Sequence, residues 1–521
     1  MPLQAARALV VLAVLAVPAR LRAQAQQPMS IAALDSLLER ARQEWDIPGM
    51  AVAIVRSDTV LLAKGYGVRE LGKPGRVDEN TLFDAASLTK SFTAAAVGVL
   101  VDEGKMRWDD PVRRWLPGFE LATPYLTSEV TMRDLLSHRA GLEAANGFWS
   151  FNQLPRDEII RRMRFLRQSA PFRTTLVYSN VGYTAAGEAA ARAAGVPWEE
   201  LIRTRLLVPA GMAHSTASFA AAGRMENVAS PHAMIDGAQR AIPREGPARD
   251  HTAPAGAVQS SAADIARWLR LQLAGGTIEG RRVVSEASLR ETQTSQVVIP
   301  TTPAFRRARN LRGTSVGYGM GWQVWDYRGR PLLWHSGSGD GQFAWMALYP
   351  DDALGVAVLV NSWLLTTTPR AEAIIAGCIA DALLATAPPD CASRARALRA
   401  SDPERSREAR RTLEAGRIAG TKPSRPLAAY AGTYVDSLYG TVEVRLENGS
   451  LVLQILPAGE TADLSHWHLD TFLARWRRPL YREYFTTRAA FHLDADGNPS
   501  AVRLRIRNDD VTLRRAPSQA P

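Results

Sequence analysis

Hydrophobic side chains recur along this chain at two different spacings, and these spacings predict its elements. In residues 30–46 they fall three or four positions apart, which predicts an amphipathic helix. The apolar runs 50–55 and 60–63 predict a hairpin, and an alanine-rich helix is expected over residues 92–101. Strand patterns return late, before a helical pattern over residues 370–384. These later strands are expected at residues 322–325, 332–335, 343–348 and 354–361.

The order of these elements predicts the fold class of the first domain. Strands at both ends of residues 26–386 enclose a long helical region. One antiparallel sheet, made from both ends of the segment and flanked by helices, buries their apolar faces. We therefore expect an α/β (α+β) domain with an inserted helical subdomain.

Composition changes after this domain. Residues 387–426 are rich in Arg, Glu, Ala, Ser and Pro, which predicts a charged linker that is either helical or flexible. Residues 427–515 show turn signals every eight to twelve residues, typical of a small all-β domain. Six strands are expected there, at residues 430–434, 441–446, 451–455, 489–493, 501–507 and 511–514.

The first 25 residues have the pattern of an export signal. Arg7 precedes an apolar run over residues 8–17, and the small-x-small triplet Ala23-Gln24-Ala25 precedes Gln26. The run is much shorter than the roughly twenty residues of a membrane-spanning helix. We expect residues 1–25 to be removed as a signal peptide, leaving a bacterial protein that is periplasmic or secreted and has no transmembrane segment. A retained N-terminal anchor is the alternative.

Charge and cysteine content limit the partners and cofactors. The formal net charge is +11, but the arginines are scattered, without a basic block interleaved with aromatic residues, so no nucleic-acid partner is expected. Cys378 and Cys391 either form a disulfide, as an oxidising compartment allows, or remain free thiols. His466 and His468 lack a companion acid or cysteine at ligand spacing. We expect no metal and no cofactor.

Ser87-Leu88-Thr89-Lys90 carries the strongest chemical signal. Residues three apart on a helix share a face, so the Lys90 amine can reach the Ser87 hydroxyl and, when deprotonated, accept its proton. The chain has only five lysines among 63 basic residues, and an arginine could not act as this base because it stays protonated. By itself the motif also fits a solvated helix face.

Two further segments supply groups that an activated serine needs. Tyr178-Ser179-Asn180 lies where a helix is expected to begin, and it offers a phenol for proton transfer and an amide for a substrate carbonyl. Trp334-His335-Ser336-Gly337-Ser338-Gly339 offers a strand edge whose small residues admit a substrate and whose N–H groups can bind an oxyanion. Taken singly, these segments also fit a core aromatic, a satisfied histidine and a hairpin turn.

The order and spacing of the three motifs resemble the serine β-lactamase and penicillin-binding-protein superfamily. The resemblance is greatest to its class C branch, with the related esterases and D-amino-acid-specific peptidases, where S-x-x-K is followed by Y-x-N and then by K-T-G or H-x-G. Residues 135–142, 227–232 and 254–261 also resemble the family, and the likeness covers roughly residues 30–385. The C-terminal segment is similar to the lipocalin-like β-barrel often appended to such domains.

The resemblance implies a role for each matching residue. Ser87 would be the acylated nucleophile, Lys90 its proton acceptor, and Tyr178 the partner base and leaving-group acid. Asn180 would orient the substrate, and the N–H groups of Ser87 and Ser338 would form the oxyanion hole. The substrate-binding segment would comprise His335, Ser336, Gly337 and Ser338.

His335 departs from the β-lactamase pattern, which has lysine at this position. A lysine keeps its charge at neutral pH, whereas a histidine ordinarily titrates near pH 6.5. We expect His335 to be only partly charged at pH 7 and to favour a substrate carboxylate at pH 5–6. This difference weakens a penicillin-hydrolysing function and favours esters, amides or peptides.

The expected function is that of an exported serine hydrolase acting on a small-molecule or peptide-like acyl substrate, with cell-wall fragments among the candidates. The alternatives are a penicillin-binding or acyl-sensing protein that deacylates slowly, and a true β-lactamase. Loops expected to include Phe148, Trp149 and Phe343 would select the substrate. The C-terminal domain would either be a scaffold or cover the cleft.

Overall fold

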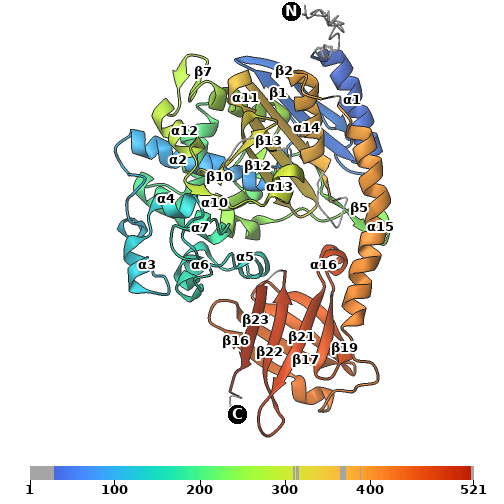
Figure 1. The fold of residues 1–521 in the computed structure, drawn as a ribbon. Coiled ribbons are helices and arrows are strands. Elements are labelled where there is room, and N and C mark those ends of the chain that lie inside the picture. The colour runs from blue at the N-terminus through green and yellow to red at the C-terminus, as the bar shows by residue number, and fades with distance from the viewer. Residues whose placement is uncertain are drawn as a thin grey trace, which may run out of the picture.

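A sheet domain and a β-barrel make up the protein, as seen in a computed structural model. The structure describes residues 28–308, 311, 316–363, 371–387, 389–507 and 509–517. The expected signal peptide, residues 1–25, lies outside these ranges. Figure 1 shows the barrel beside the larger domain, with one long helix, α15 (Cys391–Ala415), running along both.

The main sheet joins the two ends of the first domain. Its strand order is β2-β1-β14-β13-β12-β11-β10-β9, and each pairing for which a register is given is antiparallel. The predicted antiparallel sheet made from both chain ends is therefore confirmed. Its strands are β1 Gly49–Arg56, β2 Thr59–Gly67, β9 Val297–Val298, β10 Gly317–Tyr318, β11 Gln323–Tyr327, β12 Arg330–Gly339, β13 Gln342–Tyr349 and β14 Leu354–Val360.

Helices cover both faces of this sheet, which explains why β1 is apolar at nearly every position. Ala51, Ala53 and Val55 pack into the core that contains the helices α2 and α11. The alternate residues of the strand pack against α1 and α14 on the opposite face. A strand buried on both faces shows a continuous apolar run instead of alternation.

The helices of the described residues follow the predicted pattern at both ends of the domain, with the helical subdomain between them. They are α1 Ile31–Glu44, α2 Thr89–Asp102, α3 Pro124–Glu129, α4 Met132–Leu136, α5 Asn146–Phe151, α6 Arg156–Arg162, α7 Asn180–Ala194, α8 Trp198–Ile202, α9 Phe219–Ala222, α10 Ala253–Gly256, α11 Ala262–Leu273, α12 Glu286–Gln293, α13 Pro303–Ala308, α14 Ala371–Leu384, α15 Cys391–Ala415 and α16 Pro479–Tyr484. Among the described residues, no helix has the length and apolar character needed to cross a bilayer.

Short strand pairs complete the first domain. β3 pairs with β6, β7 with β8, and β4 lies between β5 and β15. The pair β3–β6 lies next to the site discussed below. These strands are β3 Phe83–Asp84, β4 His232–Ile235, β5 Ala238–Ala241, β6 Gln259–Ser260, β7 Thr277–Ile278, β8 Arg281–Arg282 and β15 Ser362–Trp363.

The C-terminal domain is a closed barrel of eight strands in chain order, β16 to β23. The all-β prediction is confirmed, but only six of the strands were expected. The two missed strands are β19 and β20, which bury about every second residue. The strands are β16 Gly432–Asp436, β17 Gly440–Glu447, β18 Ser450–Leu456, β19 Glu460–His468, β20 Thr471–Trp476, β21 Thr487–Leu493, β22 Pro499–Ile506 and β23 Asp509–Arg515.

Helix α5 of the first domain packs directly against the barrel. The Phe151 ring lies 5.1 Å from the Trp476 ring and 4.8 Å from the Tyr481 ring, centre to centre. The Asn152 amide donates to the Tyr439 carbonyl at 3.2 Å. The barrel thus fixes a helix that borders the candidate site.

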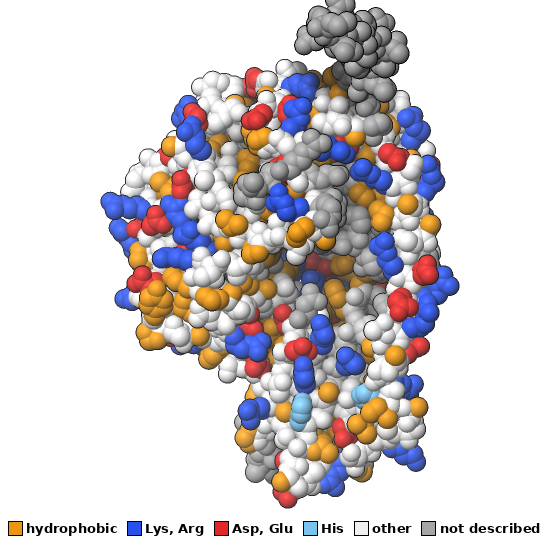
Figure 2. All heavy atoms as spheres, viewed as in Figure 1, with side chains coloured by type: hydrophobic (Ala, Val, Ile, Leu, Met, Phe, Trp, Pro, Cys, Tyr) orange, Lys and Arg blue, Asp and Glu red, His pale blue; other side chains and the backbone are white. Residues whose placement is uncertain are grey.

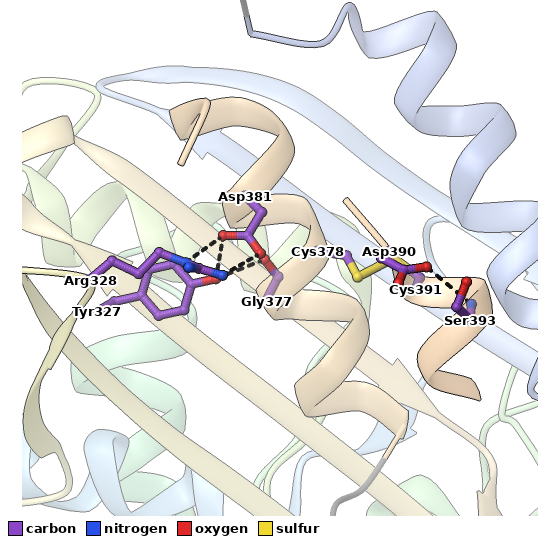
Figure 3. Close-up of a disulfide and its surroundings, with 8 residues drawn as sticks. All are labelled: Tyr327, Arg328, Gly377, Cys378, Asp381, Asp390, Cys391 and Ser393. Atoms are coloured by element: carbon purple, nitrogen blue, oxygen red, sulfur yellow. Dashed lines mark hydrogen bonds and ion pairs between the residues drawn. A yellow bond between two sulfur atoms is a disulfide. The ribbon is translucent and has the colours of Figure 1, made fainter. Parts of the chain in front are cut away.

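A disulfide joins the two helices that lead to the barrel. Cys378 of α14 is bonded to Cys391, the first residue of α15, and their Cα atoms are 5.9 Å apart (Figure 3). Of the two alternatives that the sequence left open, the structure therefore contains the disulfide and not the free thiols. Residues 391–415 of the expected linker form a helix.

We expect this disulfide to stabilise the first domain. It closes a loop of thirteen residues, for which the entropy removed from the unfolded chain corresponds to about 3 kcal/mol. The double variant Cys378→Ala/Cys391→Ala should therefore lower the urea midpoint of unfolding. Wild-type protein unfolded with reductant should match the variant, and a midpoint that reductant does not change would contradict the expectation.

Candidate active site

Ser87 lies at the turn that enters α2. It belongs to a short 3₁₀ turn, η1 (Ala86–Leu88), which continues directly into the helix. Ala86, just before it, has φ +45°, a left-handed conformation that non-glycine residues rarely adopt. The Asp84 carboxylate accepts the Ala86 N–H at 2.8 Å and the Gln259 side-chain amide at 3.0 Å. Burial raises the pKa of Asp84 to about 7. These contacts hold the turn that presents the serine.

Lys90 is completely buried, and its amine touches three oxygens. Nζ lies 3.0 Å from Ser87 Oγ, 2.7 Å from Asn180 Oδ1 and 2.8 Å from the Ala255 carbonyl oxygen. The predicted contact between Ser87 and Lys90 is present in the structure. The Ala255 carbonyl was not foreseen; it lies in the family-like stretch 254–261, but a backbone oxygen leaves no signal in a side-chain pattern.

These three contacts determine what a neutral Lys90 can do. Burial holds the pKa of Lys90 well below its usual value, which favours the uncharged amine. A neutral amine has two N–H groups and one lone pair. The oxygens of Asn180 and Ala255 can only accept, so they take both N–H groups. The lone pair is then left for the Ser87 hydroxyl.

Aromatic side chains surround the amine. Nζ lies 4.8 Å from the centre of the Tyr178 ring and 5.4 Å from that of Tyr183. His138 packs on Tyr178 at 4.3 Å between ring centres, and its Nδ1 accepts the Ser179 N–H at 3.0 Å. Its pKa is held well below the usual value by burial and by Lys90. His138, which the sequence did not single out as functional, therefore positions the segment that carries Tyr178.

Asn180, the first residue of α7, completes this group. Its side-chain oxygen accepts from Lys90 at 2.7 Å, while no hydrogen bond from its NH₂ group is found within the described part of the chain. Asn180 also lines the cavity described below. The free NH₂ group is thus available to a substrate carbonyl.

Strand β12 brings the third motif against the serine turn. A Cβ on Gly337 would lie 2.3 Å from the Ala85 carbonyl oxygen, and one on Gly339 would lie 2.2 Å from an Asp84 carboxylate oxygen. Only glycine permits this approach of strand to turn. Ser336 and Ser338, on either side of Gly337, line the same cavity as Ser87.

His335 does not behave as expected from its type. Its Nδ1 lies 2.8 Å from the Ser336 carbonyl oxygen, which can only accept, so Nδ1 carries the hydrogen and Nε2 accepts from the Tyr318 hydroxyl at 3.1 Å. Burial lowers its pKa to about 3. The expectation that His335 is partly charged at pH 7 is therefore wrong, because a buried imidazole loses the hydration that favours its cation.

A cavity of about 430 Å³ opens beside Ser87, a typical size for a small-ligand site. Figure 2 shows this face of the molecule hollowed where the first domain meets the barrel, with basic and acidic side chains interspersed around it. Trp149 lines the cavity as expected. Phe148 and Phe343 do not: Phe148 packs on the ring of Tyr439, and Phe343 on that of Trp363.

Within the described residues, no group of three or more His, Cys, Asp or Glu side chains is arranged to hold a metal ion. The candidate site is built from a serine, a lysine, a tyrosine and an amide, supported by backbone carbonyls.

Comparison with known proteins establishes the family. The beta-lactamase family model matches residues 34–377, so the chain belongs to that family. The chain is a serine hydrolase of the β-lactamase and penicillin-binding-protein type, whose members act through an acyl-enzyme. A second match, to a domain of unknown function (DUF3471), covers residues 416–516.

Individual relatives are distant. Unguisins hydrolase ungD of Aspergillus violaceofuscus is 30% identical over 359 residues, covering 63% of this chain and 61% of that protein. Penicillin-binding protein 4 of Amycolatopsis lactamdurans is 30% identical over 336 residues, covering 63% and 84%. The octameric penicillin-binding protein homologue from Pyrococcus abyssi shares the fold, with a TM-score of 0.58 and 23% identity over 93% of this chain and 100% of that one.

We expect Gly337→Ala to reduce kcat/KM roughly 100-fold, because the added methyl group forces β12 away from the serine turn by a distance that catalysis tolerates poorly. Initial rates with an activated ester measure the loss. Gly377→Ala is the control, since a Cβ there meets only Tyr327 Oη, at 3.9 Å. Equal activity of the two variants would show that the close approach is unimportant.

We expect His335 to stay uncharged across pH 5–8, since its pKa is lowered to about 3 and the neutral form therefore prevails at every pH above that value. The ionisation of His335 is measured from the ring ¹³C chemical shifts of histidine-labelled protein as a function of pH. The signal of His335 is assigned by its absence in His335→Gln. A His335 signal that titrates between pH 5 and 8 would contradict the buried, neutral assignment.

Proposed function

We propose that this protein is an exported hydrolase of the class C-related branch that cleaves an ester, amide or peptide-like acyl substrate through a Ser87 acyl-enzyme. The observation that carries the proposal is the contact of Ser87 Oγ with the buried amine of Lys90, whose two N–H groups are engaged by carbonyl oxygens. An uncharged amine in this position is a base directed at one hydroxyl.

The proposed reaction begins when Ser87 Oγ attacks the substrate carbonyl carbon and its proton passes to Lys90 Nζ. The carbonyl oxygen becomes negative and is held by the backbone N–H groups of Ser87 and Ser338. Tyr178 protonates the leaving group as the carbon–leaving-group bond breaks, which gives the acyl-enzyme. Water then attacks the ester, transferring a proton to the Lys90–Tyr178 pair, and Ser87 regains its proton on release of the acid.

One observation supports an ester, amide or peptide-like substrate over a β-lactam: the neutral His335 offers no permanent charge where the β-lactamase pattern has lysine. The A. violaceofuscus relative is named as a hydrolase of unguisins, which supports turnover. The A. lactamdurans relative is named as a penicillin-binding protein, which supports the second candidate function, acylation with slow release.

Export is part of the proposal. The N-terminal pattern of residues 1–25 and the disulfide Cys378–Cys391 both suit a periplasmic or secreted protein, because disulfides persist in oxidising compartments. Cell-wall fragments are candidate substrates in that location.

The test is active-site labelling. We expect Ser87→Ala to lose labelling by a fluorophosphonate and hydrolysis of p-nitrophenyl esters. Ser91→Ala is the matched control: Ser91 lies in α2, four residues after Ser87, is buried, and its hydroxyl donates to the Leu88 carbonyl at 2.8 Å. Peptide mass spectrometry should find the label on Ser87 in the wild type and in Ser91→Ala.

If Ser87→Ala is still labelled at the wild-type rate, on another serine, the assignment of Ser87 as the nucleophile is wrong. A stable adduct with fluorescent penicillin, without ester turnover, would favour the penicillin-binding function, and rapid hydrolysis of nitrocefin would favour a true β-lactamase.

A further inference from the structure

The barrel contributes a side chain to the candidate active site. Arg507 lies in the turn between β22 and β23, and it lines the same cavity as Ser87. Its guanidinium stands over two rings, 5.6 Å from the centre of Trp149 in the first domain and 4.9 Å from that of Phe485. Stacking of this kind fixes the plane of a guanidinium and leaves its N–H groups free to bind an anion.

The donors of Arg507 lack a close partner. No hydrogen bond from its side chain is found within the described ranges, and its buried Nε has no acceptor. The nearest carboxylate belongs to Asp340, whose Oδ1 is 3.9 Å from Arg507 Nη2. The other oxygen of Asp340 already accepts from Arg478 at 2.9 Å. The carboxylate of Asp340 is thus bound more closely by Arg478 than by Arg507.

The second arginine of the cavity differs in this respect. Arg249 also stands over Trp149, at 5.1 Å, and its Nε likewise makes no hydrogen bond within the described residues, but that Nε lies 2.8 Å from a carboxylate oxygen of Glu245. Arg249 is therefore in a much closer ion pair within the protein than Arg507, whose nearest carboxylate oxygen is 3.9 Å away. Because His335 is neutral and Lys90 is a buried base, Arg507 is the cation of the described cavity lining that remains available to a ligand.

We propose that Arg507 is a specificity-determining residue, which binds a carboxylate carried by the acyl substrate at the barrel side of the cleft. This inference rests on the proposed function, because it assigns a substrate class to the same site. It gives the barrel a direct part in substrate choice. A planar guanidinium can donate two parallel hydrogen bonds to a carboxylate, which a lysine cannot reproduce.

The competing explanation is that Arg507 only ties the barrel to the first domain through Asp340. Arg478 provides the control, since it makes the shorter contact to Asp340, at 2.9 Å, and a second to Glu460, at 3.2 Å, and it is not among the cavity-lining residues of the described structure. If the interdomain contact is what matters, Arg478→Gln should have the larger effect.

The experiment compares two esters that differ only in charge: the mono-p-nitrophenyl ester of glutaric acid, and the same compound with its free carboxylate methylated. The measured quantity is the ratio of their kcat/KM values. We expect Arg507→Gln to lower this preference for the acidic ester about tenfold, the usual loss for a charged hydrogen bond. Arg507→Lys should fall between Gln and the wild type, and Arg478→Gln should keep the wild-type ratio. Added salt should reduce the ratio in the wild type but not in Arg507→Gln.

An unchanged ratio in Arg507→Gln overturns the inference, as does an equal fall in Arg478→Gln. Thermal melting of each variant is measured alongside, and a lowered melting temperature with an unchanged ratio assigns Arg507 to the interdomain contact instead. Ser87→Ala tests the proposed function separately from the role of Arg507. If that variant still hydrolyses both esters, the proposed function is wrong, whatever the ratio in Arg507→Gln.

Discussion

The candidate site depends on the burial of one amine. Removing an ammonium group from water costs several kcal/mol, so the protein must either compensate its charge or bind it neutral. No carboxylate appears among the hydrogen-bond partners found for Lys90 in the described structure; an amide, a backbone carbonyl and Ser87 surround it instead. The alanine-rich α2, the ring of Tyr183 and the carbonyl of Ala255 all serve this arrangement. A site of this kind tolerates no carboxylate near the amine, because such a group would restore the positive charge and remove the base.

The proximity of residues three positions apart on a helix could be predicted from the sequence. Contacts between segments far apart in the chain could be predicted only in part. Ser87 and Lys90 are three residues apart, and the continuous apolar run of β1 predicts its burial in the sheet. The role of the Ala255 carbonyl could not be predicted, since every residue has one. The ionisation of His335 depends on how deeply it is buried, which its neighbours in the sequence do not determine. Strands β19 and β20 were missed although they bury about every second residue, as do β22 and β23, which were expected.

The barrel contacts the first domain beside the candidate cavity. It supports α5 through the contacts of Phe151 with Trp476 and Tyr481, as a scaffold would. The same helix places Trp149 in the cavity, and the β22–β23 turn places Arg507 there as well. The support of α5 and part of the cavity lining therefore come from one interface, so a sequence change that repacks the interface also reshapes the cavity.

The pairing of β1 with β14 has a consequence for how the protein is made. Met50 lies opposite Val360, so β1 leaves the ribosome long before its partner on that side exists. At about 5–20 residues per second, the delay is on the order of tens of seconds. During this time an apolar strand has one edge unpaired, a state that invites association with other chains. Delaying collapse until the whole chain has been synthesised would therefore protect the nascent protein, and a chaperone that holds β1 extended would serve that purpose.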